Sequence, residues 1–415
     1  MRRVAITGLG VVSALGIGTP ALWDGLCAAR SGVGRVTRIN SEAIGVPIAA
    51  EVRDFDPDVH CAGAPIDQLD RVAQFAVCAA REAVDHAGLE LSDEERDRSG
   101  VSIGCGGGGL VTLDEENRRV YEGRSRRLHP LTVPRIMANA AASHVGMLYG
   151  MRGPTICLST ACASSGHAIG EAFEFIRAGR ADVMLAGGAE AQITVPVMLA
   201  WEALRVLART SDGDPSRACR PFSRTRNGLV IGEGSAVVVL ELWERAIARG
   251  ARIYAELAGY GVTADASHLT HPTVREPVRA IRMALDRAGL TPSDIDYVNA
   301  HGTATRVNDA TETRVIREVF GPHADRLAVS STKSMHGHAI GASGAIELVA
   351  TVLATAHSIA PPTANYDEPD PECDLDYVPN AARPMPIRAA ISNSFAFGGL
   401  NAVLAVKRCD QTPRR

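Results

Sequence analysis

The sequence predicts an α/β protein in which layers of buried strands alternate with layers of helices. Short apolar runs rich in β-branched residues alternate along the chain with longer segments of helical periodicity. Hydrophobic residues make up 46% of the chain and charged residues 22%, a balance typical of a globular protein. At 415 residues, with roughly 150 residues per domain as a guide, the chain has room for two or three structural units.

Four apolar runs are the candidate buried strands, and two stretches show helical periodicity. The strands are expected at residues 4–6, 101–103, 183–186 and 236–240, and the helices at residues 171–178 and 277–288. Gly8 and Gly10 follow the first run and resemble a dinucleotide-binding fingerprint, but its third glycine is missing, so no dinucleotide site is predicted. The glycine-rich segment 104–109 lacks the Lys-Ser/Thr pair of a phosphate-binding loop and predicts a sharp turn.

Charge and composition exclude several classes of function. The formal net charge is −4 and aromatic residues make up 4% of the chain, so we expect neither nucleic acid nor an anionic membrane surface as a partner. No run approaches the roughly 18 consecutive apolar residues of a membrane span. Nine irregularly spaced cysteines without a CxxC pair argue against a disulfide framework and a zinc site, and they indicate a reducing, cytoplasmic location.

Cys162 is the strongest candidate for a nucleophile. It lies within residues 159–165, a run of small residues between a strand-like stretch and a long helical pattern. A sulfur at a helix start lies at the positive end of the helix dipole, so the sequence predicts a lowered thiol pKa. Two distant histidine motifs, at residues 301–305 and 333–338, suggest acyl-transfer chemistry that is assembled across the fold.

These motifs resemble those of the β-ketoacyl synthase family, the decarboxylating condensing enzymes of the thiolase superfamily. Residues 160–165 are similar to the nucleophile motif of that family. The two histidine motifs and a glycine-rich segment follow in the family's order, at residues 301–309, 333–344 and 393–401. The resemblance extends from residue 4 to about residue 407, which is nearly the whole chain.

The resemblance implies a five-layer α/β/α/β/α body built from two similar halves. We place the boundary near residue 250, so that residues 1–250 carry Cys162 and residues 251–415 carry both histidine motifs and the glycine-rich segment. Residues 105–135 are expected to be an insertion in the first half.

The resemblance also assigns the central roles. Cys162 accepts the acyl group, and its backbone N–H forms an oxyanion hole together with the N–H of Phe397. His301 and His338 donate hydrogen bonds to the enolate that forms when a malonyl thioester loses carbon dioxide. No metal or organic cofactor is expected, because the substrates arrive on the phosphopantetheine arm of an acyl carrier protein.

Four further residues match supporting positions of the family. Lys333 corresponds to a buried lysine that organises the histidines, and Glu347 is its expected partner, because a buried lysine is costly unless it is paired. Thr303 and Thr305 correspond to hydroxyls that bind the phosphopantetheine arm, although hydrogen bonds within a turn would also account for them.

Several positions depart from the family pattern and bear on which acyl groups are accepted. Ala396 replaces a hinge glycine beside the gate residue Phe397, and Leu229 replaces a phenylalanine near the catalytic pocket. Leu113 matches a position that helps to floor the acyl tunnel at the dimer interface of the fatty-acid enzymes. The other departures are Ala304, where glycine or serine is usual, Ser223 and Asn227, where acidic residues are usual, and Arg306, which favours the polyketide branch.

We therefore predict an elongating 3-oxoacyl-(acyl-carrier-protein) synthase of a fatty-acid or type II polyketide pathway. The carrier protein is the expected partner, and either a homodimer or a heterodimer with a chain-length-factor-like subunit is expected. The candidate carrier-docking arginines, for which a solvated charged surface is the alternative, are Arg205, Arg209, Arg118 and Arg119.

Three other functions are possible for a chain with a candidate nucleophilic cysteine. A thiolase needs a second cysteine near the C-terminal loop, but residues 397–399 contain none and Cys409 lies beyond them. A chain-length subunit lacks the nucleophile, so Cys162 argues against it, although a non-catalytic or weakly catalytic chain-length or interaction subunit of a ketosynthase heterodimer stays open as the second hypothesis. A cysteine hydrolase needs one Cys-His pair and would leave Lys333, His338 and Glu347 unexplained.

Overall fold

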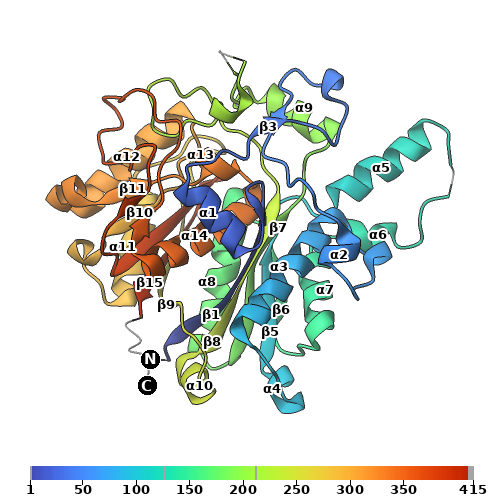
Figure 1. Cartoon of the computed structure of the whole chain (residues 1–415), viewed down its shortest axis with the longest axis horizontal. Coiled ribbons are helices and arrows are strands. Elements are labelled where there is room, and N and C mark those ends of the chain that lie inside the picture. The colour runs from blue at the N-terminus through green and yellow to red at the C-terminus, as the bar shows by residue number, and fades with distance from the viewer. Residues whose placement is uncertain (1, 126, 211–212, 410–415) are drawn as a thin grey trace.

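The computed structural model describes residues 2–125, 127–210 and 213–409. The main sheet of this part of the chain contains eleven strands, ten of which form two blocks of five (Figure 1). In spatial order, the first block is β6 (Thr155–Leu158), β5 (Ser99–Gly104), β7 (Val183–Glu190), β8 (Gly234–Leu242) and β1 (Val4–Ser13). The second block is β11 (Ala328–Ser330), β10 (Tyr297–Asn299), β14 (Ala389–Ala396), β15 (Leu400–Arg408) and β9 (Ala255–Ala264).

The two blocks have the same topology. When the five strands of a block are numbered in chain order, the second strand pairs in parallel with the third and with the fourth. The fifth strand pairs antiparallel with the fourth and with the first. β1 and β9 pair antiparallel where the blocks meet, which joins them into one sheet. This shared order is the internal repeat that the family resemblance implies, and it is invisible in the sequence itself.

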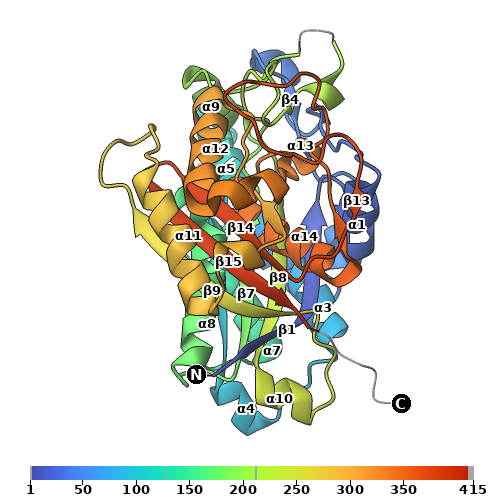
Figure 2. The same cartoon turned by 90° about the vertical axis from the view of Figure 1, so that its left-hand side faces the viewer.

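Helices complete the five layers, as predicted. The central layer consists of α8 (Ser164–Arg177) and α14 (Ser343–His357), which contact each other and strands of both blocks and lie in the middle of Figure 1. The outer layers are α3 (Arg71–Ala87) and α7 (Ala140–Tyr149) on the first block, and α11 (Arg275–Ala288) and α12 (Arg306–Phe320) on the second, where they face the viewer in Figure 2. The central helices begin at the same place in each repeat, after β6 and after β11.

The remaining elements are short or lie around the edges. The other helices are α1 (Thr19–Cys27), α2 (Pro57–His60), α4 (Asp93–Asp97), α5 (Leu110–Tyr121), α6 (Thr132–Ile136), α9 (Val195–Ala203), α10 (Trp243–Ala248) and α13 (Lys333–His336). The 3₁₀ turns are η1 (Ser41–Ala43), η2 (Ile66–Gln68), η3 (Ala161–Ala163), η4 (Pro215–Arg217), η5 (Pro292–Asp294), η6 (Gly321–Arg326) and η7 (Ile340–Ala342). The minor strands are β2 (Gly16–Ile17), which pairs with β1, and the pairs β3 (Gly34–Arg35) with β4 (Ile48–Ala49) and β12 (Ile359–Ala360) with β13 (Arg383–Pro384).

The glycines of the first strand serve helix packing. A Cβ atom on Gly10 would lie 1.9 Å from the carbonyl oxygen of Ala79 on α3, and one on Gly8 would lie 2.0 Å from that of Ala83. Only glycine at these positions lets α3 approach β1 so closely. Their spacing therefore reflects a helix lying against a strand.

The predicted elements are present, but several are longer than expected. The strand predicted at 183–186 continues to Glu190, because Gly187 and Gly188 keep pairing with β8. The helix predicted at 171–178 begins at Ser164. Its first turn is built from buried small residues, which carry no apolar periodicity and so gave no helical signal.

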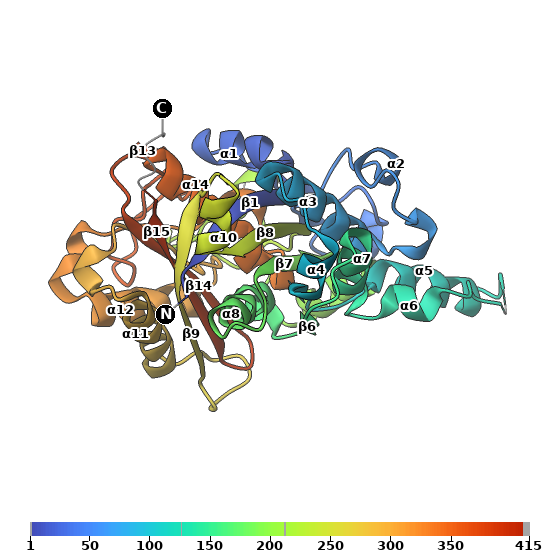
Figure 3. The same ribbon diagram turned by 90° about the horizontal axis from the view of Figure 1, so that it is seen from below.

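The insertion predicted at 105–135 forms an arm that contains α5 and α6 and projects from the body (Figure 3). Several large apolar side chains of this arm are exposed. Tyr121 is 85% exposed and Val133 is 63% exposed, and Val120 and Leu128 are also exposed. Such a concentration of exposed apolar side chains is typical of a surface that is covered in an assembly.

One segment of the described chain, residues 340–357, is long and apolar enough to cross a membrane. In the structure 89% of this segment is buried, and most of it forms the central helix α14. Its apolar character is therefore explained by its position between the two blocks of the sheet.

Candidate active site

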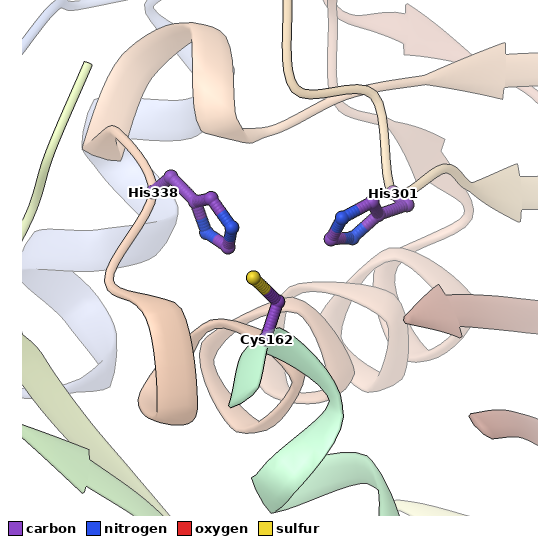
Figure 4. A group of neighbouring side chains, drawn as sticks. All are labelled: Cys162, His301 and His338. Carbon is purple, nitrogen blue, oxygen red and sulfur yellow. The ribbon is translucent and has the colours of Figure 1, made fainter. Parts of the chain in front are cut away.

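Three chemically competent side chains converge between the two blocks, as Figure 4 shows. Cys162 lies on η3, between β6 and α8. His301 follows β10, and His338 lies between α13 and η7. The sulfur of Cys162 and one ring nitrogen of each histidine lie within 4.8 Å of one another. The structure thus brings together the three residues that the separate sequence motifs singled out.

The hydrogen bonds of the two imidazoles orient both rings toward the thiol. Nδ1 of His301 lies 3.4 Å from the ammonium nitrogen of Lys333, which can only donate, so Nδ1 accepts and the proton of a neutral ring lies on Nε2. Nδ1 of His338 lies 2.8 Å from Oγ of Ser343, while its Nε2 is buried without a hydrogen-bond partner among the described residues. When Ser343 donates to Nδ1, Nε2 of His338 also carries a proton that faces the thiol.

Both rings are neutral near neutral pH. Burial lowers the pKa of His301 and of His338 well below the ordinary value, and the neighbouring Lys333 ammonium lowers both further. A buried neutral imidazole with a free N–H is a hydrogen-bond donor that carries no net charge of its own. Two such donors suit an oxygen that acquires negative charge during a reaction.

Lys333 and Glu347 form the predicted buried pair. Both side chains are fully buried, and their ammonium and carboxylate groups form an ion pair. Nζ of Lys333 also donates to the backbone oxygen of His301 at 2.6 Å. Burial raises the pKa of Glu347 to about 7, and the charge of Lys333 opposes that shift. The pair therefore fixes the His301 turn against α14.

The thiol itself differs from the prediction. Burial raises the pKa of Cys162 to about 12, although the Lys333 charge and the backbone N–H groups of Phe397 and Cys162 act in the opposite direction. The expectation of a lowered pKa was wrong because complete burial outweighs the helix dipole. Cys162 is therefore a neutral thiol near neutral pH in this structure.

The same two N–H groups are the ones for which the sequence predicts an oxyanion hole. The backbone N–H groups of Phe397 and Cys162 both interact with the Cys162 sulfur. An acyl group bound to that sulfur would place its carbonyl oxygen beside the same donors. Phe397 begins the turn between β14 and β15, where Gly398 and Gly399 both have positive φ angles of 85° and 67°.

Two contacts hold the Phe397 turn in place. The ring of Trp201 stacks on that of Phe397 with 6.2 Å between centroids, and the Trp201 indole donates to the side-chain oxygen of Gln192 at 3.2 Å. On the other side, the backbone N–H of Asp265 donates to the Gly399 oxygen at 2.8 Å. The turn is therefore clamped between α9 and the loop that follows β9.

A cavity of about 280 Å³ opens at the thiol. Its walls include Thr303, Thr305, Leu229, Ala396 and Phe397, all of which the sequence singled out. The hydroxyls of Thr303 and Thr305 are 2.9 Å apart, and Thr305 also caps α12. The structure is therefore compatible both with binding of the phosphopantetheine arm and with hydrogen bonding within the turn. The rim includes two histidines to which the sequence assigned no role, His268 and His271.

Other predicted site residues lie outside this cavity. Leu113 lines a second cavity of about 600 Å³ between the arm and α9. Arg118 and Arg119 lie on α5, where they pair with Asp114 at 2.7 Å and Glu116 at 2.8 Å. Arg205 and Arg209 line a surface depression next to the active-site mouth, where Arg205 follows the mouth residue Leu204 in sequence.

Two buried carboxylates were not predicted. Glu312 accepts hydrogen bonds from the backbone N–H groups of His301 and Gly302, both at 2.8 Å, and thereby holds the first histidine turn. Glu190 accepts from the N–H groups of Gly106, Gly107 and Gly341. The only signal in the sequence was the presence of a carboxylate among apolar or small residues, which indicates a buried and therefore partnered group.

Each of the three turns that carry Cys162, His301 and His338 contains a strained backbone position. Ala161 precedes the nucleophile with a φ of 49°, Ala304 lies in the first histidine motif with a φ of 65°, and Ile340 follows the second with a φ of 40°. Residues other than glycine rarely adopt this left-handed region, and such strain is typical of functional sites. The positive φ of Ala304 gives the physical reason why glycine is usual at this position.

The arrangement supports acyl transfer followed by the stabilisation of an enolate. The thiol can receive an acyl group beneath two backbone donors, and two neutral imidazoles face the same space. Cys162, His301 and His338 could also ligate a soft divalent cation such as zinc. The adjacent Lys333 ammonium disfavours that use, because it would repel a second positive charge.

Comparison with known proteins gives consistent matches. Residues 1–246 match the model of the β-ketoacyl synthase N-terminal domain, and residues 254–367 match that of the C-terminal domain. Nodulation protein E of Rhizobium sp. (strain N33) is 45% identical over 98% of this chain and 99% of its own length. 3-oxoacyl-[acyl-carrier-protein] synthase 2 of Synechocystis sp. is 44% identical over 98% of both chains.

Two solved structures extend these matches to three dimensions. The ishigamide ketosynthase/chain length factor has a TM-score of 0.92 at 38% identity, covering 98% of this chain and 99% of that one. A ketosynthase structure in which a type II polyketide acyl-carrier protein is in complex with its ketosynthase, bound to the hexaketide, has a TM-score of 0.89 at 35% identity. That match covers 99% of this chain and 100% of the other.

Proposed function

This chain belongs to the β-ketoacyl synthase family and is a condensing acyltransferase, and we propose that Cys162, His301 and His338 carry out its reaction in two stages. The observation that carries this proposal is the convergence of one thiol and two neutral imidazole donors, within 4.8 Å of one another, beneath two backbone N–H groups.

In the first stage, Cys162 takes an acyl group from a thioester. The sulfur attacks the thioester carbonyl, and the N–H groups of Cys162 and Phe397 hold the oxyanion of the tetrahedral intermediate. The intermediate collapses when the carrier's thiolate leaves, and that thiolate takes up the proton that the Cys162 thiol gives up. A thioester replaces a thioester, so the step needs no external energy source.

In the second stage, a malonyl thioester enters and loses carbon dioxide. The electron pair of the broken carbon–carbon bond forms an enolate, whose oxygen accepts hydrogen bonds from His301 and His338. The enolate carbon attacks the acyl carbonyl on Cys162, and the Cys162 thiolate leaves and takes up one proton from the solvent, which the overall reaction consumes. The product is a 3-oxoacyl thioester, longer than the acyl group by two carbons.

We further propose that the substrates are carried by an acyl carrier protein and that no metal or organic cofactor takes part. Support comes from the cavity, whose mouth is bordered by the exposed Leu204 and Val307 with Arg205 beside them, a pattern suited to an acidic carrier with an apolar arm. The guanidinium group of Arg205 has no hydrogen bond or ion pair among the described residues, so its charge is available. A cytoplasmic location accords with the nine free cysteines.

We also propose that the exposed apolar arm packs against a second ketosynthase-like chain. The ketosynthase/chain length factor among the similar structures is a precedent for such a pair. The second chain is either another copy of this protein or a chain-length-factor-like subunit. Purification of the protein from its native host, followed by mass spectrometry of any co-purifying chain, distinguishes the two.

The proposed function is tested with three variants and two assays. Cys162→Ala should abolish acylation and condensation but retain decarboxylation of malonyl-carrier protein, since both histidines remain. His301→Ala should lower decarboxylation on the order of 10²- to 10³-fold, as expected for loss of a donor to developing charge. His357→Ala, on the outer end of α14, is the control and should leave both assays unchanged.

Intact mass spectrometry follows acylation of Cys162, and release of carbon dioxide follows decarboxylation. Carbon–carbon bond formation by the Cys162 variant would overturn the assignment. Absence of acylation in the wild type, even with its partner chain present, would instead favour a non-catalytic subunit.

A further inference from the structure

The two predicted oxyanion-hole donors come from different halves of the chain, so their separation depends on contacts between the halves. The N–H of Cys162 belongs to η3 at the start of α8, whereas that of Phe397 belongs to the turn between β14 and β15. Such donors stabilise an oxyanion only when both are held within hydrogen-bond distance of the same oxygen. A side chain that fixes η3 relative to β15 therefore bears on the first stage of the reaction.

The turn that carries Cys162 is strained and needs to be held. Ala161 has a φ of 49°, which is costly for a residue other than glycine. Oγ of Ser164 accepts from the N–H of Thr160 at 2.9 Å and donates to the carbonyl oxygen of Ala161 at 2.6 Å. These bonds fix the turn internally, but they do not connect it to β15.

His167, in the first turn of α8, adds a second set of contacts around the nucleophile. Its Nδ1 lies 2.8 Å from Oγ1 of Thr160 and 3.0 Å from the carbonyl oxygen of Ala163. These two residues lie on either side of Cys162 in the chain. The Thr160 hydroxyl can donate or accept, so its contact with Nδ1 persists in either tautomer of the ring. His167 thereby closes the turn around the nucleophile.

The same ring also interacts with the second half of the chain. The backbone carbonyl of Asn401, on β15, interacts with the His167 imidazole. The side chain of Asn401 donates at 3.2 Å to the carbonyl oxygen of Gly399, which ends the Phe397 turn. A line of contacts thus runs from the nucleophile turn through His167 and Asn401 to the turn that carries the second N–H.

The surroundings of His167 leave its ring little freedom. The side chain is buried, and its ring packs edge-on against that of Tyr260 on β9, with 6.4 Å between centroids. A Cβ atom on the preceding Gly166 would lie 3.0 Å from Cβ of Ala402, so this face of α8 lies directly against β15. Burial lowers the pKa of His167, so the ring is neutral near neutral pH. Within the described part of the chain it does not line the active-site cavity, so it acts through its neighbours.

We propose that His167 is a positioning residue that holds the Cys162 turn in register with the Phe397 turn, so that both N–H groups reach the carbonyl oxygen of the incoming thioester. The inference rests on the proposed function, because it concerns acylation of Cys162 in the first stage. Decarboxylation in the second stage depends instead on His301 and His338, whose rings are oriented by other contacts. Loss of His167 should therefore slow acylation selectively.

The test compares acylation with decarboxylation in matched variants. Intact mass follows acylation of Cys162 by carrier protein loaded with straight acyl chains. Release of carbon dioxide from malonyl-carrier protein follows decarboxylation in a Cys162→Ala background. His167→Leu removes both ring nitrogens and should lower the acylation rate about 10- to 100-fold, as expected for misplaced reacting groups, while decarboxylation stays unchanged. His167→Asn keeps an amide N–H near the position of Nδ1 and should recover most of the lost rate.

Two further variants complete the design. His323→Leu is the matched control, because it also removes a ring nitrogen that contacts a backbone carbonyl, that of Ile295 at 2.8 Å. His323 lies on η6, which packs against the outer helix α12, so this variant should leave both rates unchanged. Thr160→Val removes only the hydroxyl that contacts Nδ1 of His167 and should lower acylation in the same direction but by less.

The outcomes separate this inference from the proposed function. An unchanged acylation rate in a folded His167→Leu variant, or in Thr160→Val if the leucine variant does not fold, overturns the role of His167. An equal loss of acylation and decarboxylation also overturns it, because a general structural effect would then explain both. So does a His167→Asn variant that is as slow as His167→Leu. If the wild type carries out neither acylation nor decarboxylation, the proposed function fails instead.

Discussion

Replacing Glu347 by alanine is expected to destabilise the protein strongly, because it leaves the Lys333 ammonium buried without a counter-charge. Both side chains are fully buried in the structure. Removing one partner of such a pair typically costs about 3 to 5 kcal/mol of unfolding free energy. Lys333 keeps its hydrogen bond to the His301 oxygen, which offsets part of the loss.

Proton release by the lysine sets an upper limit on this cost. A buried ammonium can escape the penalty by releasing its proton, at about 1.4 kcal/mol for each pH unit below the ordinary lysine value of about 10.4. At pH 7 this limit is about 5 kcal/mol. Because the limit falls as the pH rises, the deficit of the Glu347→Ala variant should shrink by up to about 1.4 kcal/mol per unit between pH 7 and 9.

The assay is urea unfolding followed by tryptophan fluorescence at several pH values. A double variant, Lys333→Met with Glu347→Leu, is the matched control. It replaces the pair by apolar groups of similar size and should recover wild-type stability within about 1 kcal/mol, but without condensation activity. A deficit below about 1 kcal/mol in Glu347→Ala, or one that does not change with pH, would refute the idea of a buried, mutually dependent pair.

Three further outcomes test the electrostatics and strain of the site. Because burial raises the pKa of Cys162 to about 12, the rate at which iodoacetamide alkylates the free enzyme should rise about tenfold per pH unit up to pH 9 without a plateau. A plateau of this rate near pH 7 would contradict the raised pKa. Ala304→Gly should relieve the φ of 65° and raise stability in urea by up to about 1 kcal/mol, and a loss of stability would speak against strain. Burial raises the pKa of Glu190 from 4.5 to about 7, so between these pH values the folded state retains a proton that the unfolded state releases. The free energy of unfolding therefore falls as the pH rises through that range. Glu190→Gln should reduce this pH dependence in urea unfolding, and an unaltered pH dependence would assign it to other groups.

Much of the site could be predicted because its motifs are local. Cys162, His301 and His338 each lie in a short run of small residues whose order along the chain carries the family pattern, and all three converge as expected. Lys333 could be paired with Glu347 because burial of a lysine demands a partner, and the ion pair is present.

What the sequence could not supply depends on three-dimensional surroundings. Burial of Cys162 reverses the direction of its pKa shift, and no local pattern reports the depth of a residue. Glu190 and Glu312 act through backbone N–H groups that come from elsewhere in the chain. The repeated strand order was likewise hidden, because it resides in pairings between strands rather than in similar residues.

The stacking of Trp201 on Phe397 gives the molecule an optical reporter of its own. Trp201 is one of three tryptophans, and the other two, Trp23 and Trp243, lie on α1 and α10. With those two replaced by phenylalanine, the emission of the protein comes from the one indole that touches the turn carrying an oxyanion-hole donor. A change in the contact between Trp201 and that turn, for instance on acylation of Cys162, would then be measurable as a change in fluorescence without an added dye.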